Sequence, residues 1–480
     1  MTATETTATE TRVPTPRDPV RVALRTIPVV LFLGTCLAVV RYVAEPLTNP
    51  DTYFHLRFGH EFLTSWSLRA PGSVTPFATR SWLPTQWSSQ VLMALTEDRF
   101  GVAGVAWLRG AWVLGLTLAV YVAARRQAPS LAAACVTMLA LAASVPSLSA
   151  RPQVLSYVFV VIVTATALES SRDGRVRWWL VPLTWVWATA HGMWPLGPVI
   201  SLVAALGALL DRDLPVRARL RLLALPVLCA AAAAATPVGP GLYGAVLNVS
   251  ARAGYFSEWA PPHFTDAIGF VPATMLGLTV LLRLRSGSVP WAELLLIGTA
   301  AACLLYSIRT LPVAAAMLAP LLATAIAPHL APQPAPRSEK RVVGLGVALS
   351  LVLLALVVPG AAGGGPTQPR WVDERLQEMP AGTVMIGDSA WGGYLMWRYP
   401  QIDIVMHGYG DTFTDAELDR NVAIEALEPG WDSLVNEVRA DRALVSPDSS
   451  LAYGLESQLG WTVVEESKDV MLLQAPDSAG

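Results

Sequence analysis

The residues best suited to chemistry are Asp51 and His55, in the first long polar stretch of the chain. Asn49 and Pro50 precede them, and these residue types are typical of a helix start, with Asn at the cap and Pro in the first turn. Four residues apart on a helix, Asp51 and His55 share one face. Two interpretations stay open. Asp51 either complements the helix dipole with His55 as its local partner, or it is a carboxylate that acts as a general base.

Five more candidates lie at or between the ends of apolar segments. Arg151 and Arg309 each precede such a segment, and a cation near membrane depth needs a partner, which we expect to be a phosphate, a lipid headgroup or a structural carboxylate. His191 lies in a short Ala-His-Gly turn, where it contacts a ligand or stabilises the turn. Glu258 and His263 lie in a Pro-rich stretch that either forms a substrate-binding wall or anchors at the membrane interface through its tryptophan.

The overall composition predicts the solvent that surrounds these candidates. Of the 480 residues, 53% are hydrophobic and only 15% are charged. Soluble domains carry about a quarter charged residues, so this chain lacks the polar surface of an ordinary soluble protein. We therefore expect a polytopic α-helical membrane protein located in the cell membrane.

About eleven apolar segments are long enough to cross a bilayer as helices. They cover roughly residues 20–43, 101–124, 129–148, 152–169, 178–190, 193–210, 220–236, 267–284, 290–307, 309–327 and 341–360. The fifth and sixth segments are nearly continuous, so the count depends on a break near His191. All four cysteines lie inside such runs, and their spacing matches no zinc or disulfide pattern.

The charges of the connecting loops predict the orientation of these segments. Arginines gather in alternate loops, and positive residues favour the cytoplasmic side of short loops. This predicts a disordered, cytoplasmic N-terminus over 1–19 and a transmembrane domain over 20–362. The long loops 44–100 and 237–266 then lie on the outer face, as does a separate domain over 366–480.

The C-terminal part differs from the rest in its charge. From Pro366 onward there are 7 Lys and Arg against 20 Asp and Glu, whereas the preceding residues carry 27 against 16. Strand-like and helix-like segments alternate there, with strands expected over 383–386, 402–406, 442–445 and 470–473, which predicts a small soluble α/β domain. The Gly-rich run 387–394 joins a strand to a helix, and it either holds a phosphate or sugar or is a tight turn with close packing.

The segment Asp51-Thr52-Tyr53-Phe54-His55-Leu56 resembles the signature that follows the first span in bacterial membrane proteins of the GT-C glycosyltransferase superfamily. It is also similar to the corresponding loop of oligosaccharyltransferase catalytic subunits. Further similar pieces follow in the same order: Thr75-Pro76-Phe77, Trp82 to Trp87, Ala150-Arg151-Pro152-Gln153, Ala190-His191-Gly192, Thr236-Pro237-Val238-Gly239, Glu258-Trp259 and Arg309. The resemblance covers most of residues 30–325.

This resemblance implies a GT-C-like fold and a transferase that moves a sugar from a polyprenyl-phosphate donor to an acceptor at the outer face. Asp51 would be the catalytic base, and the substrate-binding residues would be His55, Arg151, His191, Glu258, His263 and Arg309. The implied partners are membrane lipid, the lipid-linked donor and a glycan, lipid or protein acceptor, with no nucleic acid. No metal site is expected, because Asp51 and His55 supply only two ligands, and the need for a divalent metal stays open.

Two alternatives accompany this hypothesis. Thr75 stands where the resembling group commonly has an acid, and Thr85-Gln86 stands where it often has His-Glu. These departures favour a non-catalytic GT-C-like scaffold that binds lipid-linked glycan or partner proteins. Secondary transport is weaker, because acids within the spans are nearly absent apart from Glu293 near a span end.

Overall fold

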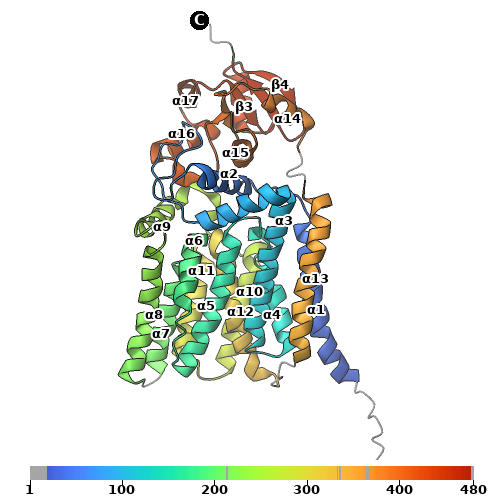
Figure 1. Cartoon of the computed structure of the whole chain (residues 1–480), viewed down its shortest axis with the longest axis vertical. Helices are drawn as coiled ribbons and strands as arrows, with labels where there is room; N and C mark the ends of the chain where they lie inside the picture. The colour runs from blue at the N-terminus through green and yellow to red at the C-terminus, as the bar shows by residue number, and fades with distance from the viewer. Residues whose placement is uncertain (1–18, 212–213, 332, 334–336, 364–367, 477–480) are drawn as a thin grey trace, which may run out of the picture.

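The structure is a computed structural model that describes residues 19–211, 214–331, 333, 337–363 and 368–476. Except for Pro19, the N-terminal segment predicted to be disordered lies outside these residues. A bundle of long helices carries a smaller α/β domain at one end, and a layer of short helices lies between the two parts (Figure 1). We call the end of the bundle that carries this domain the domain end, and the opposite end the distal end.

Within the described residues, each of the eleven predicted apolar segments coincides with one helix of the bundle. These helices are α1 (Pro19–Val43), α3 (Trp87–Arg125), α4 (Ser130–Ala142), α5 (Gln153–Asp173), α6 (Leu180–Ala190), α7 (Leu196–Asp211), α8 (Val216–Ala234), α10 (Ala267–Arg285), α11 (Trp291–Tyr306), α12 (Leu311–Ile326) and α13 (Arg337–Ala361). The turn at His191 separates α6 from α7, so the fifth and sixth segments are two helices.

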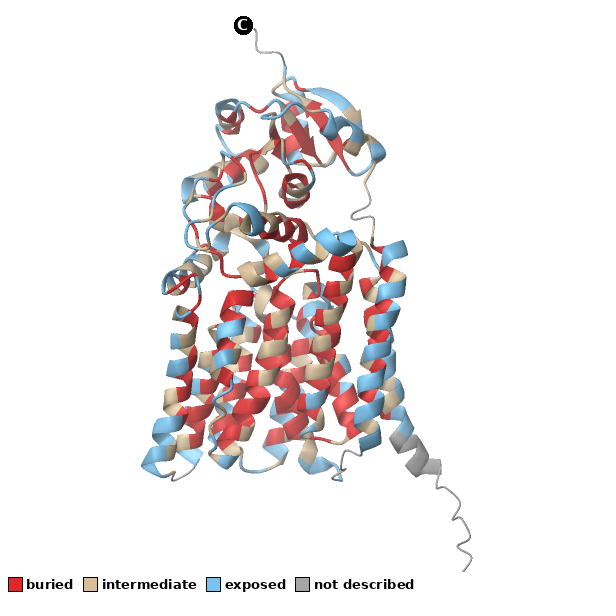
Figure 2. Ribbon diagram, viewed as in Figure 1, coloured by how far each residue is buried: buried red, intermediate tan, exposed pale blue. Residues whose placement is uncertain are grey.

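The bundle has the surface of a membrane protein. Six of its described helices are long and apolar enough to cross a bilayer, and four shorter helices are also apolar. Large apolar side chains such as Leu37, Leu284 and Leu356 are exposed on the outward faces, whereas the helix faces that meet inside the bundle are buried (Figure 2). Such exposed apolar surface requires lipid as its solvent. The protein is therefore a multi-pass membrane protein.

The layer between the bundle and the domain consists of α2 and the first part of α3. Helix α2 (Asp51–Thr64) packs against α3, and both cross the top of the bundle (Figure 1). Gly101 interrupts α3 with a left-handed φ of +63°, which a glycine adopts without strain. The chain changes direction there, so the preceding turns of α3 belong to the layer and the following turns belong to the bundle.

The C-terminal domain is a five-stranded mixed sheet covered by helices. Its strand order is β2-β1-β3-β5-β4, where β1 pairs in parallel with β2 and β3, and β5 pairs antiparallel with β3 and β4. The elements are α14 (Arg370–Gln377), β1 (Val384–Gly387), α15 (Ser389–Arg398), β2 (Asp403–Ile404), α16 (Asp415–Glu425), α17 (Trp431–Val438), β3 (Arg442–Val445), α18 (Ser450–Ser457), β4 (Thr462–Glu466) and β5 (Met471–Gln474).

The remaining short elements connect these parts. They are α9 (Gly241–Ala251) and the 3₁₀ turns η1 (Val145–Ser147), η2 (Ala253–Tyr255), η3 (Ser257–Trp259), η4 (Ile308–Thr310), η5 (Ala327–His329) and η6 (Gly410–Thr412).

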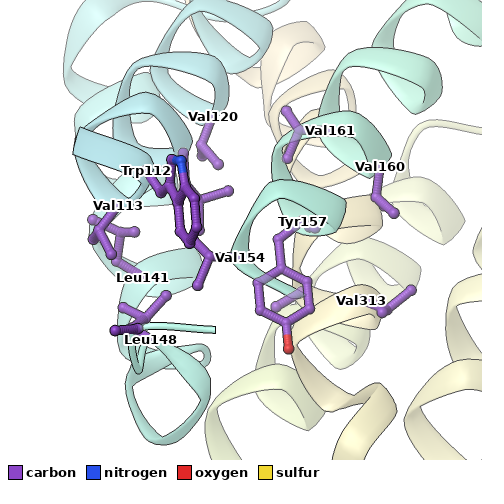
Figure 3. Close-up of a cluster of buried hydrophobic side chains, with 14 of the residues drawn as sticks. Trp112, Val113, Val120, Leu141, Leu148, Val154, Tyr157, Val160, Val161 and Val313 are labelled. Atoms are coloured by element: carbon purple, nitrogen blue, oxygen red, sulfur yellow. The ribbon is translucent and has the colours of Figure 1, made fainter. Parts of the chain in front are cut away.

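One continuous apolar core joins the bundle to the domain. Inside the bundle, Trp112 of α3, Tyr157 of α5 and Val313 of α12 belong to one buried cluster (Figure 3). The same core extends through α2 to residues of the C-terminal domain such as Tyr394. Gly393 lets the two parts approach closely, because a Cβ there would lie 2.2 Å from the carbonyl oxygen of Pro50. The 387–394 run is therefore used for close packing.

Candidate functional site

The start of α2 holds Asp51 and His55 on one face. The backbone N–H of Asp51 donates to Asn49 Oδ1 at 3.0 Å, and Pro50 already has helical φ and ψ angles of −62° and −30°. One turn later, the buried His55 places its Nδ1 3.2 Å from Gln90 Nε2. Helix α2 begins at Asp51, one residue later than predicted, and the Asn49 side chain accepts a hydrogen bond from the first residue of the helix.

His55 is neutral at physiological pH. Burial lowers the pKa of His55 well below its usual value of 6.5, and the positive charges of Arg151 and Arg309 lower it further. His55 therefore offers this region a polar, uncharged side chain rather than a cation.

Acidic and basic side chains alternate beside Asp51. Asp51 Oδ2 lies 3.1 Å from Arg151 Nη2, and the same Arg151 nitrogen lies 3.4 Å from Glu258 Oε2. The other carboxylate oxygen of Glu258 pairs with Arg309. The Arg309 guanidinium also stands over the Trp259 ring, 5.2 Å from its centroid. Glu258 thus bridges two arginines that precede the neighbouring helices α5 and α12.

His191 is held in one tautomer by its surroundings. The backbone N–H of Met193 donates to His191 Nδ1 at 3.3 Å, so the proton of the neutral ring is on Nε2. Ser156 Oγ lies 2.8 Å from the same Nδ1 and accepts a hydrogen bond from the indole N–H of Trp187 at 2.8 Å. This network keeps the Nε2–H of His191 available to a ligand.

These side chains surround one cavity of about 330 Å³ at the domain end of the bundle. Six of the seven predicted site residues line it: Asp51, His55, Arg151, His191, Glu258 and Arg309. His263 is exposed in the connection between η3 and α10 and is not among the lining residues. The roles assigned to all seven residues stay predictions, but the structure brings six of them together.

The bundle side of the cavity is apolar. Its side chains come from the loop before α7 and from α7, α9 and α12, and they are Met193, Pro195, Leu196, Val199, Val246, Val249 and Val313. The cavity therefore joins a charged region to an apolar wall, which suits a ligand with one polar and one apolar part.

The C-terminal domain supplies lining residues that the sequence did not reveal. They are Gly408, Tyr409, Gly410 and Asp411, which we call the 408–411 segment. The segment follows strand β2 and leads into η6. The only local signal is an aromatic residue and an acid between glycines just after a buried strand, and this pattern is common in ordinary turns.

Arg252 fixes the 408–411 segment above the cavity. Its guanidinium donates to the carbonyl oxygens of Gly410 at 2.8 Å and Phe413 at 2.7 Å, and it also bonds to Asp415. The approach is tight, since a Cβ at Gly410 would lie 2.1 Å from the ring of Phe256. Phe256 itself lines the cavity. Hydrogen bonds and close packing thus hold the 408–411 segment in place as one wall of the cavity.

Two of the three residues that depart from the GT-C pattern line the cavity, and the third, Thr75, does not. Thr75 Oγ1 donates to the carbonyl oxygen of Ile404 at 2.7 Å and so ties the layer to the C-terminal domain. Thr85 and Gln86 line the cavity. Neutral polar groups therefore occupy positions where the pattern suggests histidine and acid.

Among the described residues, no group of three or more His, Cys, Asp or Glu side chains is arranged to hold a metal ion. The expectation that Asp51 and His55 do not form a metal site stays a prediction.

No protein family and no curated protein matches the chain by sequence. Several solved structures match by shape. ArnT from Cupriavidus metallidurans in the apo state matches with a TM-score of 0.51 and 17% identity, over 94% of this chain and 98% of that chain. The oligosaccharyltransferase AglB from Archaeoglobus fulgidus, in complex with an inhibitory peptide and a dolichol-phosphate, matches with a TM-score of 0.51 and 12% identity, over 90% of this chain and 70% of that chain.

The chain has a GT-C fold. The fold predicted from the sequence is confirmed over nearly the whole chain, including the C-terminal domain. The arabinofuranosyltransferase AftD from Mycobacteria also matches, with a TM-score of 0.50 and 16% identity, over 94% of this chain and 40% of that chain.

On this GT-C fold, the cavity combines three chemical capabilities. Asp51 is a carboxylate that can accept a proton, and Arg151 and Arg309 are cations that can stabilise an anion. The apolar wall suits a hydrocarbon chain. Groups of these three kinds in one cavity fit a ligand that combines an anionic group with a hydrocarbon chain.

Proposed function

We propose that this protein is a membrane glycosyltransferase that moves a sugar from a polyprenyl-phosphate donor to the hydroxyl group of an acceptor. One observation carries the proposal: Asp51, Arg151 and Arg309 meet in a single cavity that also has an apolar wall. Solved structures of the same fold add support, because one ArnT structure is described as bound to undecaprenyl phosphate and one AglB structure as bound to dolichol-phosphate.

In the proposed reaction, Asp51 accepts the proton of the acceptor hydroxyl as its oxygen forms a bond to the anomeric carbon of the sugar. The bond between that carbon and the phosphate oxygen breaks, and its electron pair leaves with the lipid phosphate. Arg151 and Arg309 stabilise the phosphate, because bidentate guanidinium groups match its oxygens. A single base predicts inversion at the anomeric carbon.

Glu258 lies between Arg151 and Arg309, where the donor phosphate would bind. Its two carboxylate oxygens contact Arg151 and Arg309, as two oxygens of a phosphate would. Because the side chain of Glu258 is 35% exposed and lies in the short turn η3, it can leave without disturbing the bundle. The donor phosphate then replaces one carboxylate between the same two cations.

The proposal includes an orientation. With the N-terminus in the cytoplasm, the domain end and the domain over 366–480 face the outside, where donors carried by a lipid are available and nucleotide sugars are not. A glycan, a lipid or a protein at that face is the acceptor.

The test is Asp51→Asn in the native host. A strain that lacks the protein would be complemented with wild type, with Asp51→Asn and with Asp98→Asn, and the envelope glycans would be compared. Asp98 is a matched control, because it lies in the same layer and is not a cavity-lining residue. We expect Asp51→Asn to lower transfer by about 10²- to 10⁴-fold, as for the loss of a general base.

A normal glycan profile from Asp51→Asn, at normal expression, would rule out this catalytic scheme. It would favour the second candidate, a non-catalytic scaffold of the same fold that binds lipid-linked glycan. The observation behind that candidate is that Thr85 and Gln86, rather than a histidine and an acid, line the cavity.

A further inference from the structure

The 408–411 segment lines the cavity from the C-terminal domain. The apolar wall comes from the bundle helices α7 and α12, the loop before α7 and the connecting helix α9, and the C-terminal domain lies above the bundle (Figure 1). The two arginines lie at the domain end, where Arg151 precedes α5 and Arg309 precedes α12, and Arg309 is close enough to Asp411 for their charges to interact. The cavity thus has three successive zones: apolar, cationic and polar.

These three zones determine the orientation in which a lipid-linked donor binds in the cavity. The prenyl chain fits the apolar wall, and the phosphate fits the arginines. The sugar is attached on the other side of the phosphate and must therefore face the 408–411 segment. This step rests on the proposed function.

The side chains of the segment suit a sugar. Asp411 has two acceptor oxygens for hydroxyl groups, and Phe256 and Tyr409 supply aromatic surface beside it. Burial and the charge of Asp411 raise the pKa of Tyr409 well above its usual value of 10, so its hydroxyl stays a neutral donor. A site built to bond hydroxyl groups strongly rejects a ligand that lacks them.

The neighbouring cations do not fully compensate for the burial of the Asp411 carboxylate. Burial raises the pKa of Asp411, and the charges of Arg252, Arg80 and Arg309 together with a hydrogen bond from Tyr409 offset this effect only in part. A raised carboxyl pKa means that the ionised form costs folding free energy at neutral pH. A carboxylate kept at such a cost, on the wall of a cavity, indicates a ligand-binding role.

We propose that Asp411 is the residue through which the C-terminal domain recognises the sugar of the lipid-linked donor. The domain is then part of the substrate site rather than an appended module. Asp411 accepts hydrogen bonds from sugar hydroxyl groups, while Arg252 holds the segment in place.

The experiment uses the full-length protein in nanodiscs. Its affinity would be measured for undecaprenyl phosphate and for undecaprenyl phosphate linked to glucose, galactose, mannose or arabinose, with wild type, Asp411→Asn and Asp448→Asn. Asp448 is an exposed acid of the same domain and is not a cavity-lining residue. We expect wild type and Asp448→Asn to prefer at least one glycosylated lipid over the bare lipid by about tenfold or more, as for a charged hydrogen bond.

We expect Asp411→Asn to lose this preference and to bind bare undecaprenyl phosphate as wild type does. Its melting temperature should be equal to or above that of wild type, since a costly buried charge is removed. Asp411→Glu keeps the charge that faces Arg80 and Arg252, and it should not restore the preference, because its carboxylate is displaced by one methylene group.

Other results would overturn the inference. A preference that survives in Asp411→Asn, or equal binding of bare and glycosylated lipids by wild type, would show that Asp411 does not read the sugar. If Asp411→Asn lost affinity equally for bare and glycosylated lipids, or melted at a much lower temperature than wild type, Asp411 would have a structural role. If wild type binds none of these lipids, the proposed function itself fails.

Discussion

Two clusters of the same chemical type stand at opposite ends of the bundle, and their difference is instructive. At the domain end, Glu258 bridges Arg151 and Arg309. At the distal end, Glu293 of α11 bridges Arg172 and Arg283. Each cluster is one carboxylate between two guanidinium groups, and α5 ends near one cluster and begins near the other.

The two clusters differ in the exposure of their shared carboxylate. The side chain of Glu293 is 5% exposed and that of Glu258 is 35% exposed. Arg172 is further tied to Gln127 and Thr324. The distal cluster therefore joins helices, whereas the domain-end cluster borders a cavity in which a ligand can replace its carboxylate. Packing around the charges, rather than the charges themselves, separates a structural ion cluster from a binding site.

The largest effect should come from breaking the distal cluster. Glu293→Gln leaves Arg172 and Arg283 without their shared carboxylate, and removing one partner of a buried ion pair costs about 3–5 kcal/mol. Thermal or denaturant unfolding in detergent would measure the loss. Glu169→Gln on the same helix as Arg172 is the control, because its partly exposed pairs predict a change below about 1 kcal/mol.

If Glu293→Gln is as stable as wild type, the distal cluster is not structural and the contrast between the two ends fails.

The second effect is on binding at the domain end. Arg309→Ala should weaken undecaprenyl phosphate binding by about 10- to 100-fold, the loss of a charge-assisted contact. Arg309→Lys should recover only part of it, because an ammonium group lacks the planar fork. Arg172→Ala is the matched distal control. Arg172→Ala should lower the stability of the protein and leave the lipid affinity of the folded protein unchanged. If Arg172→Ala and Arg309→Ala lost affinity equally, the distal cluster would not be purely structural.

The third effect should be a gain of lipid affinity rather than a loss. Glu258→Gln should tighten undecaprenyl phosphate binding by roughly three- to tenfold, because the neutral amide competes less with phosphate for Arg151 and Arg309. Its stability should change by less than about 1 kcal/mol, since the pair is partly exposed. Isothermal titration in nanodiscs would measure the affinity. Weaker binding would instead mean that Glu258 orients the arginines for the ligand.

The smallest effect is on the pH dependence of stability, and it concerns only the domain end. The folded protein lowers the pKa of His55 well below 6.5, so it resists a proton that the unfolded chain binds. Stability should therefore fall as pH drops below about 6.5, by at most about 1.4 kcal/mol per pH unit for one histidine. Melting curves between pH 8 and 5 would show a shallower decline for His55→Gln. An identical decline would show that folding does not lower the pKa of His55.

Sequence patterns predicted much of this architecture. The eleven predicted apolar segments correspond to the eleven bundle helices, and strand β3 has the predicted bounds. Strand β2 is shorter than predicted, because the chain leaves the sheet after Ile404 to form the 408–411 segment. Strand β4 was missed, since this exposed edge strand ends in Glu465 and Glu466 and lacks the apolar pattern of a buried one.

The sequence by itself determined which segments form the long apolar helices of the bundle, because such helices satisfy their own backbone hydrogen bonds in lipid. It also determined the cap that starts α2, since capping depends on neighbours along the chain. Only the tertiary structure decided that Arg151, Glu258 and Arg309 meet Asp51, and that Asp411 closes the same cavity. Such meetings depend on how distant segments pack, as where Gly393 rests on Pro50, and no local pattern of residues encodes that contact.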